Sequence, residues 1–228
     1  MEIALQIIVL VAGFIFLIKG ANVLVDGASS TAQNFKVSKM LIGLTIVAFG
    51  TSAPELAVSI SALASGSTDI VLGNVIGSNI INILLLIGIA ALIKPIRVKA
   101  NTVRKELPLC LLISSLLAVL FLDVKLGNGT ENLISRADAI VVLLFFGIFL
   151  YYLIAMAKHN RKQNKDKDEK PPHKLWVSIL FVILGLAGVI LGSQMVVNSA
   201  TFLAQAIGVS ERVISLTIIA FGTSLPEL

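Results

Sequence analysis

Two glutamates, Glu55 and Glu227, lie inside long apolar stretches of this 228-residue chain. A carboxyl group at such a position is unfavourable in a membrane, so it indicates a functional site when it faces the protein interior or a water-filled cavity. Each glutamate follows a proline, Pro54 or Pro226, whose nitrogen cannot donate to the carbonyl one helical turn earlier. We therefore expect the first helix to open around residues 48–50, and the second at the matching place, leaving backbone oxygens free.

The residues just before the first glutamate add further oxygen atoms. Thr51 and Ser52 lie about one helical turn before Glu55, so two hydroxyl groups share a helix face with the carboxyl group and the freed carbonyls. Hard cations such as Ca²⁺ bind several oxygen ligands, and two glutamates would neutralise one divalent ion. No His or Cys accompanies the motif, which disfavours soft metals. A structural carboxyl group capped by hydroxyls is the alternative, which the duplication of the motif disfavours.

A third apolar run carries polar side chains at helical spacing. Asn74, Ser78 and Asn82 recur on one face, between glycines that allow close helix packing. Hydrogen bonds between helices are one interpretation of such residues, and ion ligation is the other. Beside the glutamate motif we interpret Ser78 and Asn82 as ligands, whereas Asn74 and Asn79 stay open between the two roles.

The composition places these residues in an all-α, polytopic membrane protein. Apolar residues make up 57% of the chain and charged residues only 14%. The net charge of +5 does not indicate a nucleic-acid partner, because the basic residues flank apolar runs. The first run lacks a basic segment before it, so we expect a retained helix and not a signal peptide. About seven spans are predicted, the last incomplete, at residues 3–18, 41–63, 70–93, 107–122, 137–157, 175–197 and 213–228.

The basic residues also predict the orientation of the spans. With the N-terminus outside, all but three of the eighteen Lys and Arg residues fall on the cytoplasmic side, as the positive-inside rule prefers. The polar stretch 158–174 then forms a cytoplasmic linker, in which His159 and His173 are expected to be solvated. It divides the chain into a first transmembrane repeat, residues 1–157, and the start of a second, residues 175–228.

The two parts share a repeated segment. Residues 23–56 align without gaps on residues 195–228, with about half of the positions identical. In the predicted topology the two copies cross the membrane in opposite directions, so the repeat is inverted. Inverted repeats with proline-interrupted helices at matching positions are typical of transporters whose binding site lies near the bilayer midplane.

These motifs resemble the sodium/calcium exchanger branch of the Ca²⁺/cation antiporter superfamily, in particular its prokaryotic members. The resemblance depends on both copies of Gly-Thr-Ser-x-Pro-Glu, at residues 50–55 and 222–227, and on the Gly-Asn and Gly-Ser-Asn-Ile-x-Asn segments within residues 73–82. It implies a ten-helix fold of two inverted five-helix halves. By that comparison, about eighty residues of the second half would be missing from this chain.

The resemblance also implies a function and a set of ligands. It implies an antiporter, not an enzyme, that exchanges Na⁺ for Ca²⁺ by alternating access in a bacterial inner membrane. We expect no cofactor, no nucleic acid and no obligatory protein partner besides membrane lipid. The implied ion ligands are Ala48 through its carbonyl, Thr51, Ser52, Glu55, Ser78, Asn82, Ala220, Thr223, Ser224 and Glu227.

Three alternatives to this function remain open. Exchange of Ca²⁺ for H⁺ and K⁺-dependent exchange both use acidic repeats in the same superfamily. A membrane-embedded hydrolase could use paired carboxyl groups as acid and base. The sequence disfavours that enzyme, because no span carries a Ser-His pairing or a His-containing zinc motif.

Overall fold

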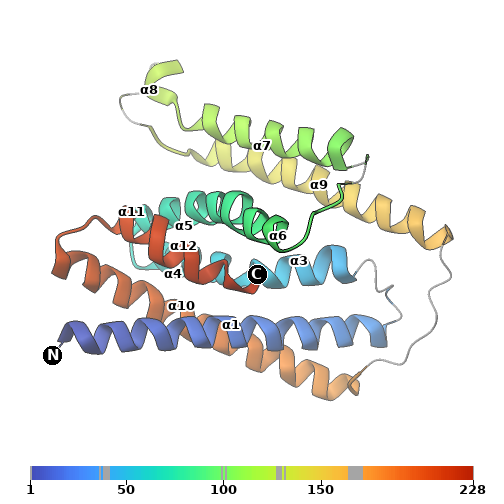
Figure 1. Ribbon diagram of the computed structural model, residues 1–228, viewed down its shortest axis with the longest axis horizontal. Helices are drawn as coiled ribbons and strands as arrows, with labels where there is room; N and C mark the ends of the chain where they lie inside the picture. Colours follow the sequence, from blue (N-terminus) through green and yellow to red (C-terminus); the bar gives the residue numbers. More distant parts are fainter. Residues whose placement is uncertain are drawn as a thin grey trace. The chain divides into compact units, whose positions relative to one another are not determined.

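The computed structural model describes residues 2–35, 37, 42–98, 100, 102–126, 130, 132–163 and 172–227, and these residues form helices without any strand (Figure 1). The chain divides into two compact units. One comprises Met1–Ile93 with Asn164–Leu228, and the other comprises Lys94–Gln163. The first unit contains both copies of the repeated motif. The predicted division into repeats at residues 1–157 and 175–228 follows sequence similarity and stays a prediction.

Two long antiparallel helices form one side of the first unit. They are α1 (Glu2–Asn34) and α10 (Leu175–Ile207), which pack against each other along much of their length (Figure 1). A Cβ atom added to Gly20 would lie 2.6 Å from the Val189 nitrogen, and one added to Gly192 would lie 2.6 Å from the Leu17 nitrogen. The two backbones therefore touch, as in membrane helix pairs built on small residues.

The glycine contacts between α1 and α10 follow the repeat. The offset that aligns the two motif copies also places Gly13 on Gly185 and Gly20 on Gly192. In the structure Gly13 faces the Gly192 carbonyl and Gly20 faces the Gly185 carbonyl. Each contact is thus the counterpart of the other under exchange of the halves, which extends the inverted repeat into the first helix of each half.

A polar cluster fastens the end of α1 to the start of α10. The Ser178 hydroxyl donates to Ser30 Oγ at 2.8 Å, and the His173 backbone N–H donates to the same oxygen at 3.2 Å. Asn34 Nδ2 donates to the His173 carbonyl at 3.1 Å. The residues that precede α10 are therefore held against the last two turns of α1.

Both motif copies form broken helices that run in opposite directions. The first copy consists of a π-helical turn η1 (Gly43–Val47), α3 (Ala48–Thr51) and α4 (Ala53–Ala64). The second consists of α11 (Glu211–Ile214), the π-helical turn η4 (Ser215–Ile219), α12 (Ala220–Thr223) and the short turn η5 (Leu225–Glu227). In Figure 1 α3 and α4 run from right to left, whereas α11 and α12 run from left to right. The predicted inversion of the two copies is confirmed.

A further helix packs against the second copy. It consists of α5 (Thr68–Ile80), the π-helical turn η2 (Ile81–Leu86) and α6 (Ile87–Ile93). A Cβ atom on Gly73 would lie 2.6 Å from Ser215 Cβ, and one on Gly77 would lie 2.6 Å from Ala220 Cβ. The two glycines therefore let α5 approach η4 and α12 closely.

The second unit is smaller. It consists of η3 (Thr102–Glu106), α7 (Leu107–Leu120), the short α8 (Asp123–Leu126) and α9 (Arg136–Gln163), with α7 packed against α9. Neither motif copy lies in this unit.

In the part of the chain that the structure describes, four helices are long and apolar enough to cross a membrane, at Glu2–Asn34, Thr68–Ile93, Arg136–Ala155 and Leu175–Ile207. The pair Thr45–Thr51 and Ala53–Ala64, bent by 50°, makes a fifth if it counts as one span. These helices correspond to five of the seven predicted spans. The other two predicted spans contain shorter described helices, because α7 has 14 residues and the second motif copy is divided into short turns.

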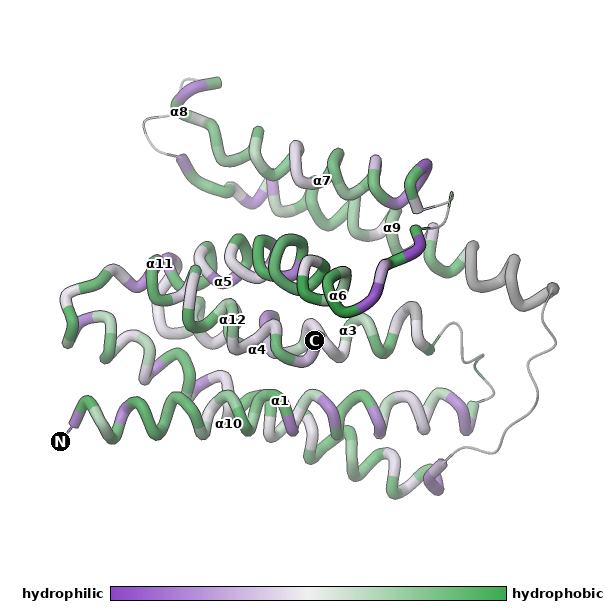
Figure 2. Tube along the Cα trace, in the orientation of Figure 1, coloured by the Kyte–Doolittle hydropathy of each residue, from purple (hydrophilic) through white to green (hydrophobic). Residues whose placement is uncertain are grey.

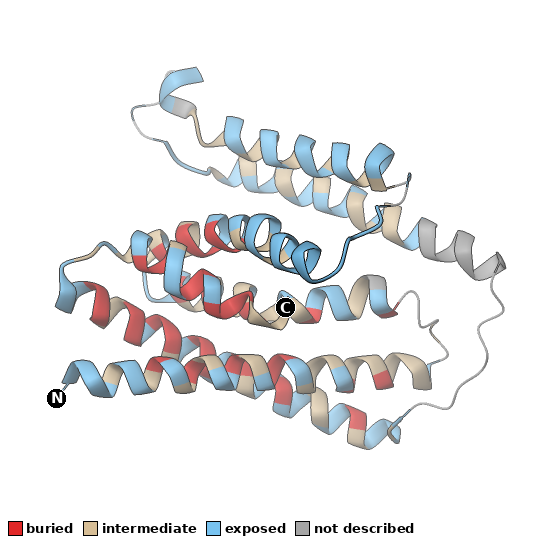
Figure 3. Cartoon of the chain, viewed as in Figure 1, coloured by how far each residue is buried: buried red, intermediate tan, exposed pale blue. Residues whose placement is uncertain are grey.

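The helices extend beyond the apolar runs that predicted them. The first predicted span ends at residue 18, whereas α1 continues through Lys19 to Asn34. The helices are mostly hydrophobic along their length (Figure 2). Buried residues concentrate on the facing sides of α1, α10, α5 and α12, while much of the remaining helix surface is exposed and rich in large aliphatic side chains (Figure 3). Such a surface is suited to contact with lipid.

Candidate functional site

Both motif helices break at the same serine of the repeat. Ser52 has φ −84° and ψ 4°, and Ser224 has φ −83° and ψ 3°. We predicted the first opening around residues 48–50, and the structure places the break slightly later, after a π-helical turn and one short α-helical turn. Proline follows two residues after each break and starts the next helical segment, where its missing N–H does least harm.

The carbonyls expected to become free have hydroxyl partners in this structure. The Thr51 hydroxyl donates to the Ala48 carbonyl at 3.2 Å, and the Thr223 hydroxyl donates to the Ala220 carbonyl at the same distance. The two copies thus share one local geometry. A cation bound at these carbonyls would require each threonine hydrogen to turn to another acceptor.

The two glutamates meet the opposite copy of the motif. Ser224 Oγ donates to Glu55 Oε1 at 3.4 Å, and the Thr223 hydroxyl lies near the same carboxyl group. In the reverse direction the Thr51 hydroxyl lies near the Glu227 carboxyl group. Each carboxyl group is therefore next to hydroxyls of the other half, and the two carboxyl groups are close enough to interact electrostatically.

Three of the predicted ligands have buried oxygen atoms without a hydrogen-bond partner. They are Oε2 of Glu55, Oε2 of Glu227 and Oδ1 of Asn82. Buried polar atoms in native proteins nearly always have partners, so each exception requires an explanation. Because ionised carboxyl oxygens and amide oxygens act only as acceptors, a cation could satisfy all three.

Ser78, which the sequence predicts as a ligand, lies on α5 next to the second copy. Ser78 is buried, and its hydroxyl oxygen lies 3.4 Å from the Thr223 hydroxyl oxygen. Asn79 instead points to an exposed face and donates to the Val75 carbonyl of its own helix. Asn74 is fully buried and contacts both motif copies. The spacing places Asn74 on the same helix face as Ser78 and Asn82, and it leaves the role of Asn74 open between ion ligation and hydrogen bonding between helices.

The two copies differ in burial. Ala220, Thr223 and Ser224 are buried, whereas Ala48 and Ser52 are exposed. The physical cause is α5, which packs on η4 and α12. Within the described ranges, no helix packs in the same way on the matching face of η1 and α3.

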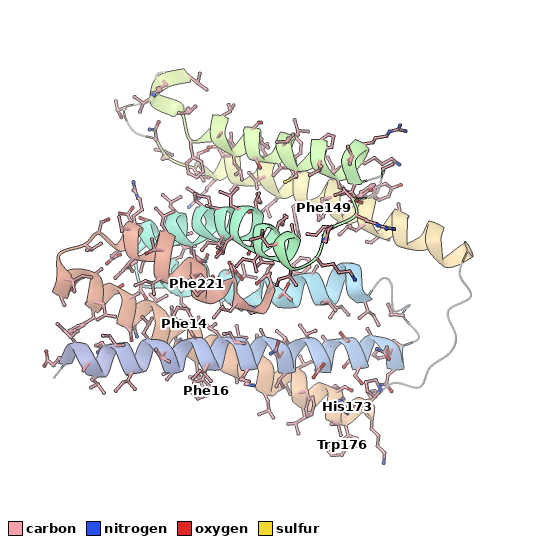
Figure 4. All side chains as sticks on the ribbon, in the orientation of Figure 1. Phe14, Phe16, Phe149, His173, Trp176 and Phe221 are labelled. Carbon is pink, nitrogen blue, oxygen red and sulfur yellow. The ribbon has the colours of Figure 1, made fainter. Side chains whose placement is uncertain are left out.

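The pair α1 and α10 contacts both motif copies. A Cβ atom on Gly222 would clash with the Phe14 ring, and one on Gly50 would clash with the Val25 side chain. Phe14 is labelled in Figure 4, where its ring lies between α1 and the second motif copy. Beside the first copy, α1, α3, α4 and α10 line a cavity of about 840 Å³, at which the Ser61 and Ser193 hydroxyls connect α4 and α10 at 2.8 Å. The long helices thus pack tightly on the motif helices only in places.

Comparison with known proteins decides the family. The profile of the sodium/calcium exchanger protein family matches residues 5–155 and 177–228. The chain belongs to this family. A relative in Methanosarcina acetivorans, the sodium/calcium exchanger MaX1, is 32% identical, with 99% of this chain and 73% of that protein covered. The inner membrane protein YrbG of Escherichia coli is 36% identical, with 96% of this chain and 67% of that protein covered.

A solved structure of the family has the same fold. The sodium/calcium exchanger from Methanococcus jannaschii matches with a TM-score of 0.58 and 34% identity, covering 99% of this chain and 70% of that one. Membership of the sodium/calcium exchanger family makes this chain an integral membrane protein and a cation antiporter of the calcium-exchanger type. The two half-buried glutamates therefore belong to a transporter and not to a hydrolase.

Proposed function

We propose that this antiporter exchanges Na⁺ for Ca²⁺ by alternating access. The observation that carries the proposal is the meeting of two broken helices from inverted repeats, at which Glu55 and Glu227 each present a buried oxygen without a partner. Asn82, on the neighbouring helix one turn after Ser78, has a third such oxygen. Two carboxylates and several neutral oxygens suit one Ca²⁺ ion, and the same oxygens can hold Na⁺ ions in its place. Competition for one set of ligands would couple the two ions.

The ligands of the proposed site come from the two broken motif helices and from the continuous helix Thr68–Ile93. The set comprises the Ala48 and Ala220 carbonyls and the side chains of Thr51, Ser52, Glu55, Ser78, Asn82, Thr223, Ser224 and Glu227. Helix breaks that expose backbone and hydroxyl oxygens near the middle of a span are a known solution for ion binding in secondary transporters. The hydrogen bond from Ser224 to Glu55, and the position of each carboxyl group next to hydroxyls of the opposite copy, support this set.

Alternating access requires a part that moves against the site. The α1–α10 pair is the natural candidate, because its two helices are joined by backbone contacts and polar bonds at one end. It also packs on Gly50 and Gly222 of the motif copies, beside a cavity that leaves room for displacement. Movement of this pair as one body would open the site to either side in turn.

The location follows from the same proposal. We place the antiporter in a bacterial inner membrane with the N-terminus outside and residues 158–174 in the cytoplasm. The predicted charge distribution supports this orientation, and the Escherichia coli relative is named as an inner membrane protein.

Reconstitution tests the proposal directly. The protein is placed in Na⁺-loaded liposomes, which are diluted into Na⁺-free buffer containing radioactive Ca²⁺. We expect Ca²⁺ entry that requires the outward Na⁺ gradient and that stops when an ionophore collapses this gradient. Ca²⁺ entry that is driven by a H⁺ gradient, or that occurs only in the presence of K⁺, would mean that the proposed coupling to Na⁺ alone is wrong. A lack of Ca²⁺ entry under every gradient, in protein shown to be folded, would overturn the proposal.

A further inference from the structure

Asn74 is the one side chain of α5 that hydrogen-bonds both motif copies among the described residues. Its Nδ2 donates to the Glu55 backbone carbonyl at 3.0 Å and to Ser59 Oγ at 3.2 Å. Its Oδ1 accepts a hydrogen bond from the Thr223 hydroxyl at 3.2 Å. The side chain is fully buried, so these protein atoms are its surroundings.

These partners fix the orientation of the Asn74 amide group. A backbone carbonyl can only accept, so the NH₂ group must face Glu55 and α4. Both of its hydrogens then have acceptors, the Glu55 carbonyl and the Ser59 hydroxyl oxygen. The amide oxygen is consequently directed at Thr223, where only a donor can satisfy it. A rotated amide group would place a donor against the Thr223 hydroxyl and an acceptor against the Glu55 carbonyl.

The Thr223 hydroxyl has one hydrogen and several neighbouring acceptors. It can donate to Asn74 Oδ1 or to the Ala220 carbonyl, both at 3.2 Å. The Ala220 carbonyl is itself a proposed ligand, so it cannot serve the hydroxyl and a cation equally well. When the hydrogen goes to Asn74, the Ala220 carbonyl and the lone pairs of Thr223 are both available to the ion.

We propose that Asn74 is a positioning residue for ion binding, which turns the Thr223 hydroxyl hydrogen away from the ion and fixes the backbone at Glu55. This inference rests on the proposed ion site. Asn74 does not ligate the ion in this role, and it acts through one ligand from each half. Outer groups that orient metal ligands in this manner commonly change metal affinity by about 10- to 100-fold.

The test compares Asn74→Ala with Asn79→Ala in Na⁺-driven Ca²⁺ uptake by reconstituted protein. Asn79 lies on the same helix, is exposed and bonds only its own helix, which makes it a matched control. We expect Asn74→Ala to raise the KM for Ca²⁺ by about 10- to 100-fold. The control should change KM by less than about twofold, as an exposed substitution does. An unchanged KM in folded Asn74→Ala protein would overturn the inference.

A double-mutant cycle separates positioning from a general packing defect. Thr223→Val removes the hydroxyl through which Asn74 acts, so adding Asn74→Ala to Thr223→Val should raise KM by no more than about threefold. If the KM increases of the two single variants multiply in the double variant, Asn74 acts independently of Thr223, which contradicts the inference. If Asn74→Ala is not monodisperse, Asn74→Ser is measured in the same cycle with the same expectation, because a serine is too short to replace both bonds.

The controls keep this inference distinct from the proposed function. Wild-type protein without Na⁺-driven Ca²⁺ uptake would contradict the proposed function itself, and the inference with it. Wild-type uptake together with a normal KM in the folded Asn74 variants would contradict only the inference.

Discussion

At the scale of single residues, Glu55 and Glu227 occupy equivalent positions in the two halves of the repeat. Each carboxyl group lies next to hydroxyls of the other motif copy, of which Ser224 donates to Glu55, and its Oε2 is buried without a partner. Neither half therefore forms a complete site alone. Because both carboxylates are needed to neutralise Ca²⁺, the loss of either leaves an uncompensated charge on the bound ion.

Replacing either glutamate by glutamine should therefore abolish Ca²⁺ exchange. We expect Glu55→Gln and Glu227→Gln each to reduce Na⁺-driven Ca²⁺ uptake by at least about 100-fold. Loss of a group that only orients a metal ligand changes metal affinity by about 10- to 100-fold, and loss of a ligand itself should have at least the larger effect. The double variant should be no worse than either single one, because groups that act as a unit are not additive. Radioactive Ca²⁺ uptake into Na⁺-loaded liposomes measures all three.

Glu211→Gln is the matched control for these variants. Glu211 lies in the first turn of α11, away from the break at Ser224. Its substitution should leave uptake within about twofold of the wild type. Substantial uptake by folded Glu227→Gln protein would contradict a site shared between the two halves.

At the scale of helices, the contact between α1 and α10 depends on glycines at matching positions of the repeat. Gly20 and Gly192 each face backbone atoms of the other helix at distances that leave no room for a Cβ atom. Close backbone approach increases van der Waals contact, which is the main attraction between helices in lipid. The glycines thus serve to join the two helices rather than to bend them.

Adding one methyl group at this contact should destabilise the protein. We expect Gly20→Ala to lower the free energy of unfolding by about 1–3 kcal/mol, because the new Cβ atom would force apart two backbones. Gly88→Ala is the control, since a Cβ atom at Gly88 meets nothing within 4 Å. The melting temperatures of Gly20→Ala and Gly88→Ala are measured by size-exclusion chromatography after heating and compared. Equal melting temperatures would contradict the importance of the close contact.

The sequence predicted more of the motif helices than of the long ones. Proline predicted a break in each motif helix, because it acts locally on the backbone. The predicted topology of the spans between the two copies predicted their inversion. The length of α1 was not predictable in this way, since hydropathy follows the lipid environment and a helix can continue through Lys19 into a polar stretch. The role of Asn74 was not predictable from the sequence either. A buried asparagine that orients a ligand and one that joins two helices have the same spacing, and only their contacts differ.

At the scale of the whole molecule, interactions at the two ends of the first unit agree with the predicted sides of the membrane. At one end Arg212 and Asp69, both predicted outside, form an ion pair at 2.6 Å. At the other end the His173 backbone, in the predicted cytoplasmic linker, bonds Ser30 near the end of α1. These contacts require the members of each pair to share a side.

Single cysteines at the two ends measure the predicted orientation. Cys110 is the only cysteine in the sequence, so Cys110→Ser provides a background without thiols. In that background we expect Ser65→Cys to react with a membrane-impermeant maleimide added to intact spheroplasts, and Pro172→Cys to react only after permeabilisation. Both positions are exposed and lie in the first unit, at the turn after α4 and just before α10. Because fifteen of the eighteen basic residues lie on the side of Pro172 in the predicted topology, the positive-inside rule places this side in the cytoplasm. The reverse labelling pattern would place the N-terminus inside, and labelling of both cysteines from one side would contradict the opposed directions of the helices between them.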